Sequence, residues 1–309
     1  MSISLEIKEI KYEPFGNCVK ITNGIIAVVV TIDFGPRIIH FGFCDEDNLL
    51  YSNVHSLHVA SSEDTEGGKI FSCSGGHRLW LNLERADSTV TPDNTPVFYT
   101  ILPGGVRFNR PKDETASVES GFEIMMGDDA ADFMILHTAK NCSKETKVCG
   151  LMPITMLAKS GLVVLPQNTD ATDMRHPNRA LAYWPGTDFR DERITYGNRF
   201  VSLRWQSGNE KPLHIGCNNV LGWMALIGEK YTFMKRYIHS PQIVYPDFGS
   251  SCEVNLRKDA VELTTLSPMY RIEPGQGIKH VENLSIFRTC NSVNPNDEEG
   301  IVKYIENLK

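Results

Sequence analysis

Short apolar runs of strand length recur along this chain, and they constrain its fold more than any other feature. Turn residues close the runs, for example at positions 33–36 and 103–105. No long helical period separates one run from the next, as it would in alternating strands and helices. The pattern therefore predicts antiparallel β architecture. The runs that carry this prediction are 24–30, 37–43, 133–137, 161–165, 200–205, 223–227, 231–237 and 261–266.

The end of the chain carries the one convincing helical pattern. Asn294, Pro295 and Asp297 supply a cap, a proline at the first position and an acid in the first turn. Apolar residues follow at positions 301, 302, 305 and 308. This pattern predicts a C-terminal helix that packs on a sheet face.

The length of 309 residues suits one large β domain or two ordinary domains. The sequence shows no Pro- or Gly-rich linker, low-complexity tract or clear internal repeat at which to divide it. We therefore expect a single domain over residues 1–309, a large double-sheet sandwich of about twenty short strands.

The charge and hydropathy of the chain limit the partners that it can bind and its expected location in the cell. The net charge is -7, and the lysines and arginines are scattered, which leaves no electrostatic footprint for nucleic acid or an anionic membrane. The first residues lack the pattern of a secretory signal, and the longest apolar stretch, 25–30, is too short to cross a bilayer. We expect a soluble cytoplasmic protein that binds neither nucleic acid nor membranes.

Cysteine spacing and the common catalytic signatures bear on cofactors. Eight cysteines are scattered without a C-x-x-C pair, which favours reduced core thiols over disulfides or zinc ligands. The chain has no G-x-S-x-G elbow, phosphate-cradling glycine loop or H-E-x-x-H helix. We expect no cofactor and no metal ion.

The segment 75–80, which reads Gly-Gly-His-Arg-Leu-Trp, has the composition of a ligand-facing loop. His77 can hold and release a proton near neutral pH, and Arg78 offers a fork of donors for an anion or a pair of hydroxyl groups. Trp80 offers an aromatic plate. A second polar cluster, Tyr245 to Asp247 with Glu253 beyond it, reads as another strand edge that faces the same groove.

These residue types also have structural interpretations. His77 fits equally a histidine that hydrogen-bonds to a neighbouring strand, and Arg78 fits a buried ion pair with Glu84 or Asp93. Lone histidines such as His137 and His214 are expected to be structural.

The aromatic residues are open to the same two interpretations. Trp80, Trp184 and Tyr245 would serve as plates for a ligand, but a tryptophan in a sandwich of this size is more often part of the core.

Several local strings, taken in order, resemble the galactose mutarotase-like superfamily and more narrowly its DUF4380 branch. Together they span about residues 20 to 288. The strings are GGHRLW at 75–80, PDN at 92–94, LHTAKN at 136–141, WP at 184–185, GW at 222–223, FMK at 233–235, YPDFG at 245–249 and EPG at 273–275.

The resemblance implies a β-supersandwich of two large antiparallel sheets whose concave sheet carries a carbohydrate groove. In the enzymatic members it implies ring opening and epimerisation at the anomeric carbon of a sugar. A histidine acts there as the acid and a glutamate as the base, since neither sugar oxygen reacts at neutral pH without proton transfer. On this basis His77 is the expected acid.

The expected base is Glu262, which lies on a strand shortly before the Pro-Gly turn at 274–275. Related sequences tend to carry a second acid two residues on, where this chain has Thr264. Residues at i and i+2 share a strand face, so Glu262 is either the base or its surviving neighbour. Glu253 and Asp247 are competing acids.

The remaining expected contacts are to the sugar itself. They come from Arg78, Trp80, Asp93, Trp184, Lys235, Tyr245 and Asp247.

Two functional hypotheses follow for a small-molecule carbohydrate partner. In the first, the protein is an isomerase of the aldose 1-epimerase type, with His77 and either Glu262 or Glu253 as acid and base. In the second, it is a carbohydrate-binding protein that keeps the groove but has lost the catalytic base, as Thr264 suggests.

Overall fold

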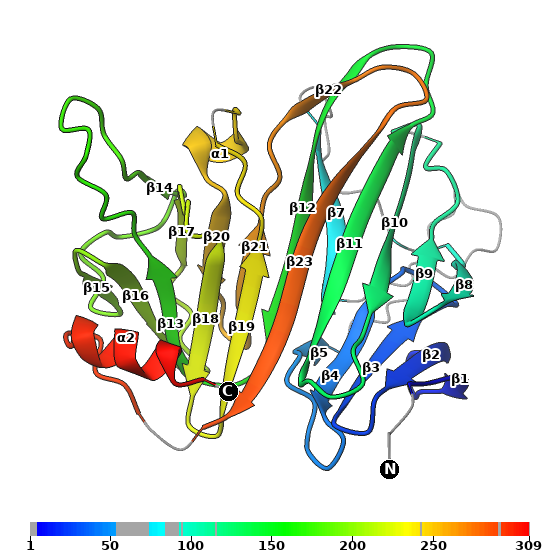
Figure 1. The fold of residues 1–309 in the computed structure, drawn as a ribbon, viewed down its shortest axis with the longest axis horizontal. Helices are drawn as coiled ribbons and strands as arrows, with labels where there is room; N and C mark the ends of the chain where they lie inside the picture. The colour runs from blue at the N-terminus through cyan, green and yellow to red at the C-terminus, as the bar shows by residue number, and fades with distance from the viewer. Residues whose placement is uncertain are drawn as a thin grey trace.

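The computed structural model of the protein describes residues 5–53, 74–83, 93, 95–114, 116–241, 243–289 and 292–308. This part of the chain forms two large antiparallel sheets that lie face to face (Figure 1). A short ribbon of β5 (Ser52–Asn53) and β6 (Ser74–Gly75) accompanies them. The apolar runs therefore predict the fold class correctly, an all-β sandwich, here with twenty-three strands in the described residues.

The first sheet has eleven strands and carries the residues of greatest functional interest. The neighbours along it are β1 (Glu6–Lys11), β2 (Asn17–Thr22), β3 (Ile26–Thr31), β4 (Ile38–Phe43), β7 (His77–Leu83), β12 (Lys147–Leu157), β21 (Val261–Thr265), β20 (Cys252–Leu256), β17 (Leu213–Cys217) and β14 (Leu181–Tyr183), with β22 (Tyr270–Ile272) paired to β12.

The second sheet has ten strands and faces the viewer in Figure 1. Its neighbours are β15 (Ile194–Tyr196), β16 (Phe200–Trp205), β13 (Gly161–Pro166), β18 (Trp223–Gly228), β19 (Tyr231–Tyr237), β23 (Gly277–Arg288), β11 (Asp132–Asn141), β10 (Val118–Met125), β9 (Gly105–Asn109) and β8 (Phe98–Leu102).

The main core fills the space between the two sheets, because each strand sends alternate side chains to opposite faces. Phe41 of β4 and Phe133 of β11 meet edge to face there, with ring centroids 4.9 Å apart. Strand β3 is buried along its whole length, which explains its continuous run of apolar residues. The sandwich is thus held mainly by apolar packing, within which any buried charge stands out.

The predicted C-terminal helix is confirmed as α2 (Glu298–Glu306). Its N-cap is Asp297, whose side chain accepts a hydrogen bond from the Gly300 amide at 2.9 Å, so the helix begins later than a cap at Asn294 would require. Ile301 is fully buried and packs with apolar residues of β13, β16 and β18. The helix therefore covers part of the outer face of the second sheet, as expected.

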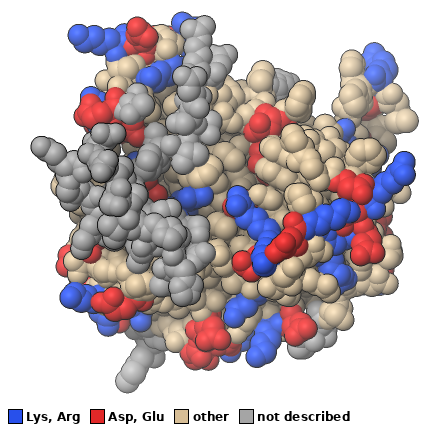
Figure 2. Space-filling model, turned by 180° about the vertical axis from the view of Figure 1, so that it is seen from behind, with Lys and Arg blue, Asp and Glu red and all other residues tan. Residues whose placement is uncertain are grey.

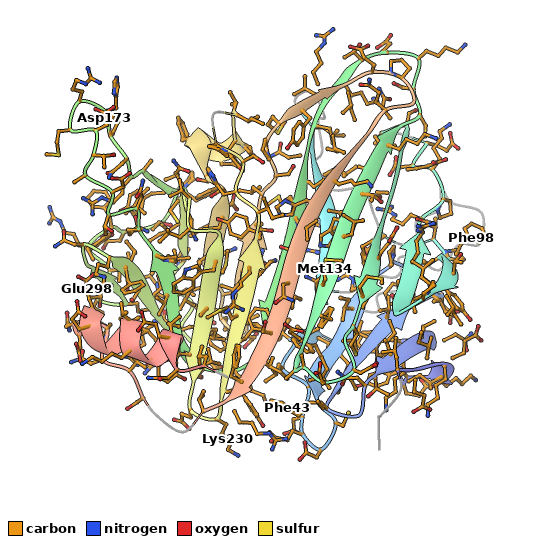
Figure 3. All side chains as sticks on the ribbon, viewed as in Figure 1. Phe43, Phe98, Met134, Asp173, Lys230 and Glu298 are labelled. Carbon is orange, nitrogen blue, oxygen red and sulfur yellow. The ribbon has the colours of Figure 1, made fainter. Side chains whose placement is uncertain are left out.

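The surface of the described residues shows no concentration of one charge sign on the side opposite to the view of Figure 1. Basic and acidic groups are interleaved there (Figure 2). The loop that bears Asp173 rises away from the sheets, and Phe98 lies at the far edge from it (Figure 3). None of the helices in the described residues has both the length and the apolar character to span a membrane.

The six described cysteines are all free. Four of them are buried, whereas Cys44 is exposed and Cys142 is partly exposed. Cys73 and Cys290 lie outside the described residues.

Candidate functional site

Strand β7 divides the 75–80 motif between the two faces of the first sheet. His77 pairs in register with Thr155 of β12 and points between the sheets, where it is completely buried. The next residue, Arg78, pairs with Ile154 and lies on the outer face.

The same alternation sorts the acids of β20 and β21. Leu263 pairs with Thr155 and belongs to the core, so its neighbours Glu262 and Thr264 lie on the outer face. Glu253 of β20 stands directly opposite Thr264. His77 and the two candidate bases are therefore on opposite sides of one sheet.

Behind the sheet, five charged or titratable residues form what we call the interior cluster: His77, His137, Lys235, His280 and Glu282. The Glu282 carboxylate lies 2.9 Å from the Lys235 ammonium and 3.0 Å from Nε2 of His137. Nε2 of His77 lies farther off, at 3.8 Å from the same carboxylate. All five side chains are buried, so this is a closed polar network inside an apolar core.

Backbone and hydroxyl groups add further hydrogen bonds to the interior cluster, although Nε2 of His77 and Nδ1 of His137 have no hydrogen-bond partner among the described residues. The Lys235 ammonium donates to the carbonyl oxygens of Pro153 and Leu263 and to Oγ1 of Thr155, each at 3.1 Å. Thr155 also bonds Nδ1 of His77 at 2.8 Å. On the far side, Thr265 contacts both His280 and Glu282.

Burial and charge set the protonation states in the interior cluster. Burial lowers the pKa of His77 well below its usual value and also lowers that of His137, so both rings are neutral at pH 7. Burial alone would raise the pKa of Glu282, but the Lys235 ammonium and the hydrogen bond from His137 hold it well below the ordinary range. Burial lowers the pKa of Lys235 in turn, against the attraction of Glu282.

The interior cluster contains the donor set most suited to a metal ion among the described residues. The ligand atoms of His77, His137 and Glu282 lie within 4.8 Å of one another. However, Glu282 already neutralises Lys235, and both imidazoles are uncharged. A divalent ion would add two uncompensated positive charges beside a buried ammonium, so these residues do not fit a metal.

The geometry corrects the expected arrangement of His77 and Lys235. Both were expected to face a sugar together with Glu253 and Glu262, yet both lie between the sheets and have no exposed surface. The physical reason is the two-residue period of a strand, which sends His77 inward whenever Arg78 faces outward. Neither residue shares a cleft with the outer acids.

On the outer face, a second group of polar residues gathers, which we call the outer cluster: Arg78, Trp184, His214, Asp247, Glu253 and Glu262. At its centre, Oε2 of Glu253 lies 3.1 Å from Nε2 of His214. The His214 ring stacks on Trp184 with ring centroids 3.8 Å apart. Gly216, opposite Glu253, gives Trp184 and Ser250 the room to approach, since an added Cβ would lie 2.4 Å from the Ser250 hydroxyl.

Asp247 reaches Glu253 from an unusual turn. It belongs to the short α1 (Pro246–Gly249), in which Asp247 and Phe248 have left-handed backbone angles, with φ of 49° and 58°. Residues other than glycine rarely adopt this region, so the turn is strained. The carbonyl oxygens of Pro246 and Asp247 accept from the Ser250 amide, and that of Asp247 also accepts from the Ser250 hydroxyl, whereas Phe248 is 98% exposed.

Asp247 and Glu253 form a carboxyl pair that retains a proton. Burial and the neighbouring Glu253 raise the pKa of Asp247 to about 6. Burial, together with the charge of Glu262, raises the pKa of Glu253 to about 7. One proton therefore belongs to the pair rather than to either residue near neutral pH.

His214 supports the carboxyl pair as a neutral ring. Burial lowers its pKa to about 4, so the ring is neutral at pH 7, with Nε2 in hydrogen-bond contact with Oε2 of Glu253. The other carboxylate oxygen of Glu253, Oε1, is buried without a hydrogen-bond partner among the described residues. That oxygen remains available to share the proton with Asp247.

Glu262 is more fully engaged than Glu253. One carboxylate oxygen accepts from Nε of Arg257 at 2.8 Å, and the other accepts from the Asn255 amide at 2.7 Å. Both oxygens are thus occupied, which makes Glu262 the weaker candidate for a base.

Arg78 is the cation of the outer cluster. Its guanidinium group lies over the Trp80 ring, 4.1 Å from the ring centroid. Asp93, which was expected to bind sugar or pair with Arg78, instead bonds the buried Arg37 at 2.5 and 3.0 Å. Glu84, the other expected partner, lies outside the described residues.

Tyr245 does not serve as an open aromatic plate. It is buried, its ring stacks on His239 at 4.9 Å, and its hydroxyl accepts from the Ser240 amide at 2.8 Å. It supports the base of the turn that carries Asp247.

His214 is the site residue that the sequence did not single out. No local motif marks it, because its contact with Glu253 depends on how β17 pairs with β20. The alternating pattern of residues 213–217 places it on one face with Gly216, which is the only signal available beforehand.

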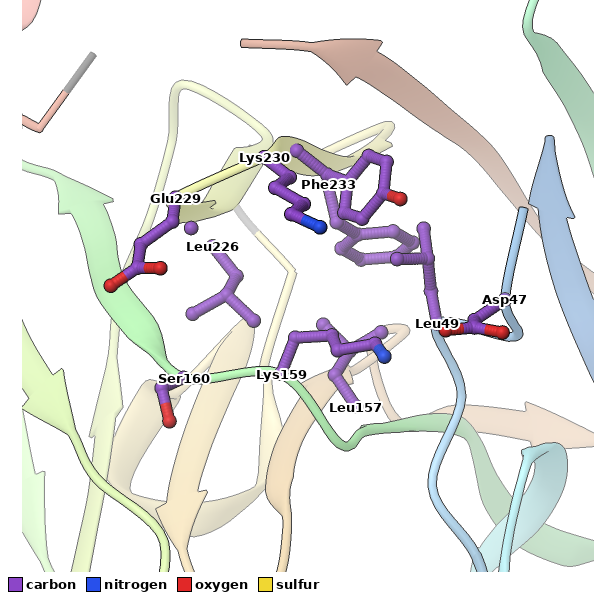
Figure 4. Close-up of a pocket in the computed structure, with 11 residues that line it drawn as sticks. Asp47, Leu49, Leu157, Lys159, Ser160, Leu226, Glu229, Lys230 and Phe233 are labelled. Atoms are coloured by element: carbon purple, nitrogen blue, oxygen red, sulfur yellow. The ribbon is translucent and has the colours of Figure 1, made fainter. Parts of the chain in front are cut away.

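A separate hollow of about 350 Å³ lies at the end of the sandwich near Lys230 (Figure 3, Figure 4). Leu157, Leu226 and Phe233 line it, and Lys159 lies beside them. Asp47, Glu229 and Lys230 also line it, and no residue of the outer cluster does, so it is distinct from that cluster.

Comparisons with known proteins agree with this architecture. No protein-family model matches the sequence, and no curated protein matches it. Among solved structures, a galactose mutarotase-like protein from Clostridium acetobutylicum aligns with a TM-score of 0.52 and 9% identity, over 92% of this chain and 99% of that one. A galactose mutarotase related enzyme from Lactobacillus acidophilus gives 0.50 and 10%, over 90% and 99%.

A TPR-domain containing protein from Parabacteroides distasonis aligns with a TM-score of 0.58 and 10% identity, over 91% of this chain. The match covers 48% of that protein, so this chain spans about half of its length. The likenesses to the two galactose mutarotase-like structures show that the chain has this fold, as the resemblance predicts. Placement in the DUF4380 branch stays a prediction.

Proposed function

We propose that this protein is a carbohydrate-active enzyme of the aldose 1-epimerase type, which interconverts the anomers of a small sugar. The observation that carries the proposal is the carboxyl pair of Asp247 and Glu253 on the outer face of the first sheet. Near neutral pH it holds one acidic proton and one carboxylate side by side. The resemblance supplies the reaction type, and the fold is compatible with it.

The chemistry requires an acid and a base close together. Ring opening needs a proton at the ring oxygen while another leaves the anomeric hydroxyl, and both oxygens are bonded to the same carbon. One member of the pair donates to the ring oxygen, and the other accepts the hydroxyl proton. Closing the ring after rotation reverses both transfers and returns the pair to its starting state.

The other outer residues have supporting roles in this proposal. His214 holds one oxygen of Glu253, and Trp184 fixes the His214 ring by stacking. Glu253 stands directly opposite Thr264, so a carboxyl group from β20 covers the place where related sequences have an acid on β21. Glu262 is retained as a secondary base, and His77 has no direct role.

Saturation-transfer NMR over a panel of aldoses tests this function. We expect anomer exchange faster than in buffer, with a bell-shaped pH profile whose maximum lies near pH 6 to 7, where the pair holds a single proton. Exchange no faster than in buffer for every sugar would remove the enzymatic proposal.

The second candidate is a carbohydrate-binding protein without turnover. Thr264 in place of an acid and the full engagement of Glu262 favour it. Calorimetric titration separates the two functions, because sugar binding without accelerated exchange supports the second and absence of both excludes it. In either case the proposed partner is a small carbohydrate, and we propose a cytoplasmic location from the reduced cysteines.

A further inference from the structure

The outer cluster contains one cation that lacks a counter-ion. Among the described residues, no acceptor hydrogen-bonds to the Arg78 side chain and no carboxylate lies in ion-pair range of it, and its Nε atom is buried without a partner. Two other arginines near this face are paired, Arg257 with Glu262 and Arg37 with Asp93. Arg78 is therefore charged but unmatched.

The surroundings of Arg78 make this unpaired charge costly in free energy. Burial lowers its pKa to about 10, Arg37 contributes in the same direction, and the charges of Asp93 and Glu262, which do not contact Arg78, oppose the shift only in part. The group is still charged at neutral pH. A partly buried charged donor without an acceptor costs free energy, which an anionic ligand would recover.

The orientation of Arg78 leaves its donors available. Trp80 covers one face of the guanidinium plane, and that contact uses none of the N–H groups. The edge of the plane can therefore hold two oxygens of one carboxylate in the forked geometry that arginine favours.

Arg78 and the carboxyl pair lie at two ends of one cross-strand row. The row runs from Arg78 through Ile154 and Thr264 to Glu253. Three inter-strand steps of about 4.8 Å place the two end backbones about 14 Å apart. Arg78 lies over Trp80 of its own strand, and Glu253 contacts His214 of β17, the neighbour of β20 on the side away from Arg78, so the span between the two groups is long enough for one hexose.

We propose that the substrate is a sugar acid whose carboxylate is held by Arg78 while its anomeric carbon lies at Asp247 and Glu253. This inference rests on the proposed function for the position of the anomeric carbon. A single guanidinium matches the one charge and the planar shape of a carboxylate. A phosphate dianion would bring a second negative charge into a face that already holds the carboxyl pair and Glu262.

Three sugars that differ at carbon 6 test the inference: glucuronate, glucose and glucose 6-phosphate. We expect glucuronate to bind and exchange at least ten-fold better than glucose in the wild-type protein. Arg78→Met removes this preference, and Arg78→Lys keeps a part of it because the charge remains. Arg175→Met, on an exposed loop away from the outer cluster, leaves the preference unchanged.

The outcomes separate the inference from the proposed function. Equal rates for glucuronate and glucose overturn the inference and leave the epimerase function standing, as does a preference for glucose 6-phosphate. Tight glucuronate binding that depends on Arg78, without exchange, supports the sugar acid and removes the enzymatic function. No binding of any of the three sugars overturns the inference. Thermal unfolding of each variant verifies that it is folded.

Discussion

The two faces of the first sheet carry polar clusters of opposite character within the same few strands. The interior cluster is sealed from solvent and its charges are paired, with Glu282 between Lys235 and His137 and backbone carbonyls accepting from the ammonium, although Nε2 of His77 and Nδ1 of His137 have no hydrogen-bond partner among the described residues. The outer cluster is unfinished, with a shared proton on Asp247 and Glu253 and an unmatched Arg78. Paired charges that are sealed from solvent favour a structural role for the interior cluster, whereas an unmatched charge and a shared proton favour the outer cluster as the candidate site.

The largest expected effect comes from breaking the interior cluster. Glu282→Gln leaves the Lys235 ammonium buried without its counter-charge, so we expect the free energy of unfolding to fall by about 3–5 kcal/mol. Urea denaturation measures it. The double variant Lys235→Met with Glu282→Leu should recover much of the loss, because it removes both charges. A loss below about 1 kcal/mol in the single variant would contradict a closed ionic network.

The outer cluster should respond in activity rather than in stability. Glu253→Gln removes the carboxylate from the pair, so we expect the anomer exchange rate to fall about 100-fold or more while the chain stays folded. Saturation-transfer NMR and urea denaturation measure the two quantities. Glu210→Gln, an exposed acid paired with Lys258, is the matched control. Unchanged exchange in Glu253→Gln would assign the chemistry elsewhere.

His77 gives the sharpest comparison between the two faces. Because it lies inside the sandwich, His77→Gln should lower the free energy of unfolding by about 1–2 kcal/mol through its lost bond to Thr155. The exchange rate should stay within about three-fold of wild type, well short of the loss expected for a proton-transfer group. A 100-fold loss of exchange at unchanged stability would return His77 to the catalytic role that its motif suggests.

The smallest expected effect is a pH dependence of stability on the outer face. The pKa of Glu253 is about 7 in the folded chain, above its ordinary value of 4.5. The folded chain thus keeps a proton that the unfolded chain has released, so this stability is complete below pH 4.5 and is lost as pH rises through about 7.

A glutamine at position 253 does not titrate. The stability of Glu253→Gln relative to wild type should therefore increase by about 1–2 kcal/mol between pH 5 and pH 8. Urea denaturation at several pH values measures this difference. A difference that stays constant with pH would show that Glu253 is ionised throughout.

The sequence predicts the fold well because the apolar runs report a two-residue period directly. Strands such as β13 and β19 lie within a residue of the runs at 161–165 and 231–237. The C-terminal helix is predicted equally well from the sequence, although its N-cap is Asp297 rather than Asn294. Local patterns suffice here because strands and caps are local features.

The site is predicted less well because it depends on the face of the sheet to which each side chain points. The motif at 75–80 does not indicate that His77 faces inward and Arg78 outward. The sequence would be the same if the strand turned its other face to the core. His214 and Glu253 come from strands thirty-nine residues apart and meet only through the pairing of β17 with β20. Glu253, Asp247 and Trp184 are nevertheless candidates from the sequence, because acids and aromatics near turns stand out in an apolar sequence, and they stay predictions as site residues.

The bonds made by Lys235 have a consequence for how the outer face accommodates a ligand. Its ammonium donates hydrogen bonds to carbonyl oxygens of both β12 and β21. These two strands carry Ile154 and Glu262 on their opposite face. These hydrogen bonds therefore hold the middle of the outer face in place from the interior side, so this part of the face is preorganised and rigid. Adjustment to sugars of different size has to come from the periphery, where the strained turn at Asp247 and Phe248 stands free of that anchor.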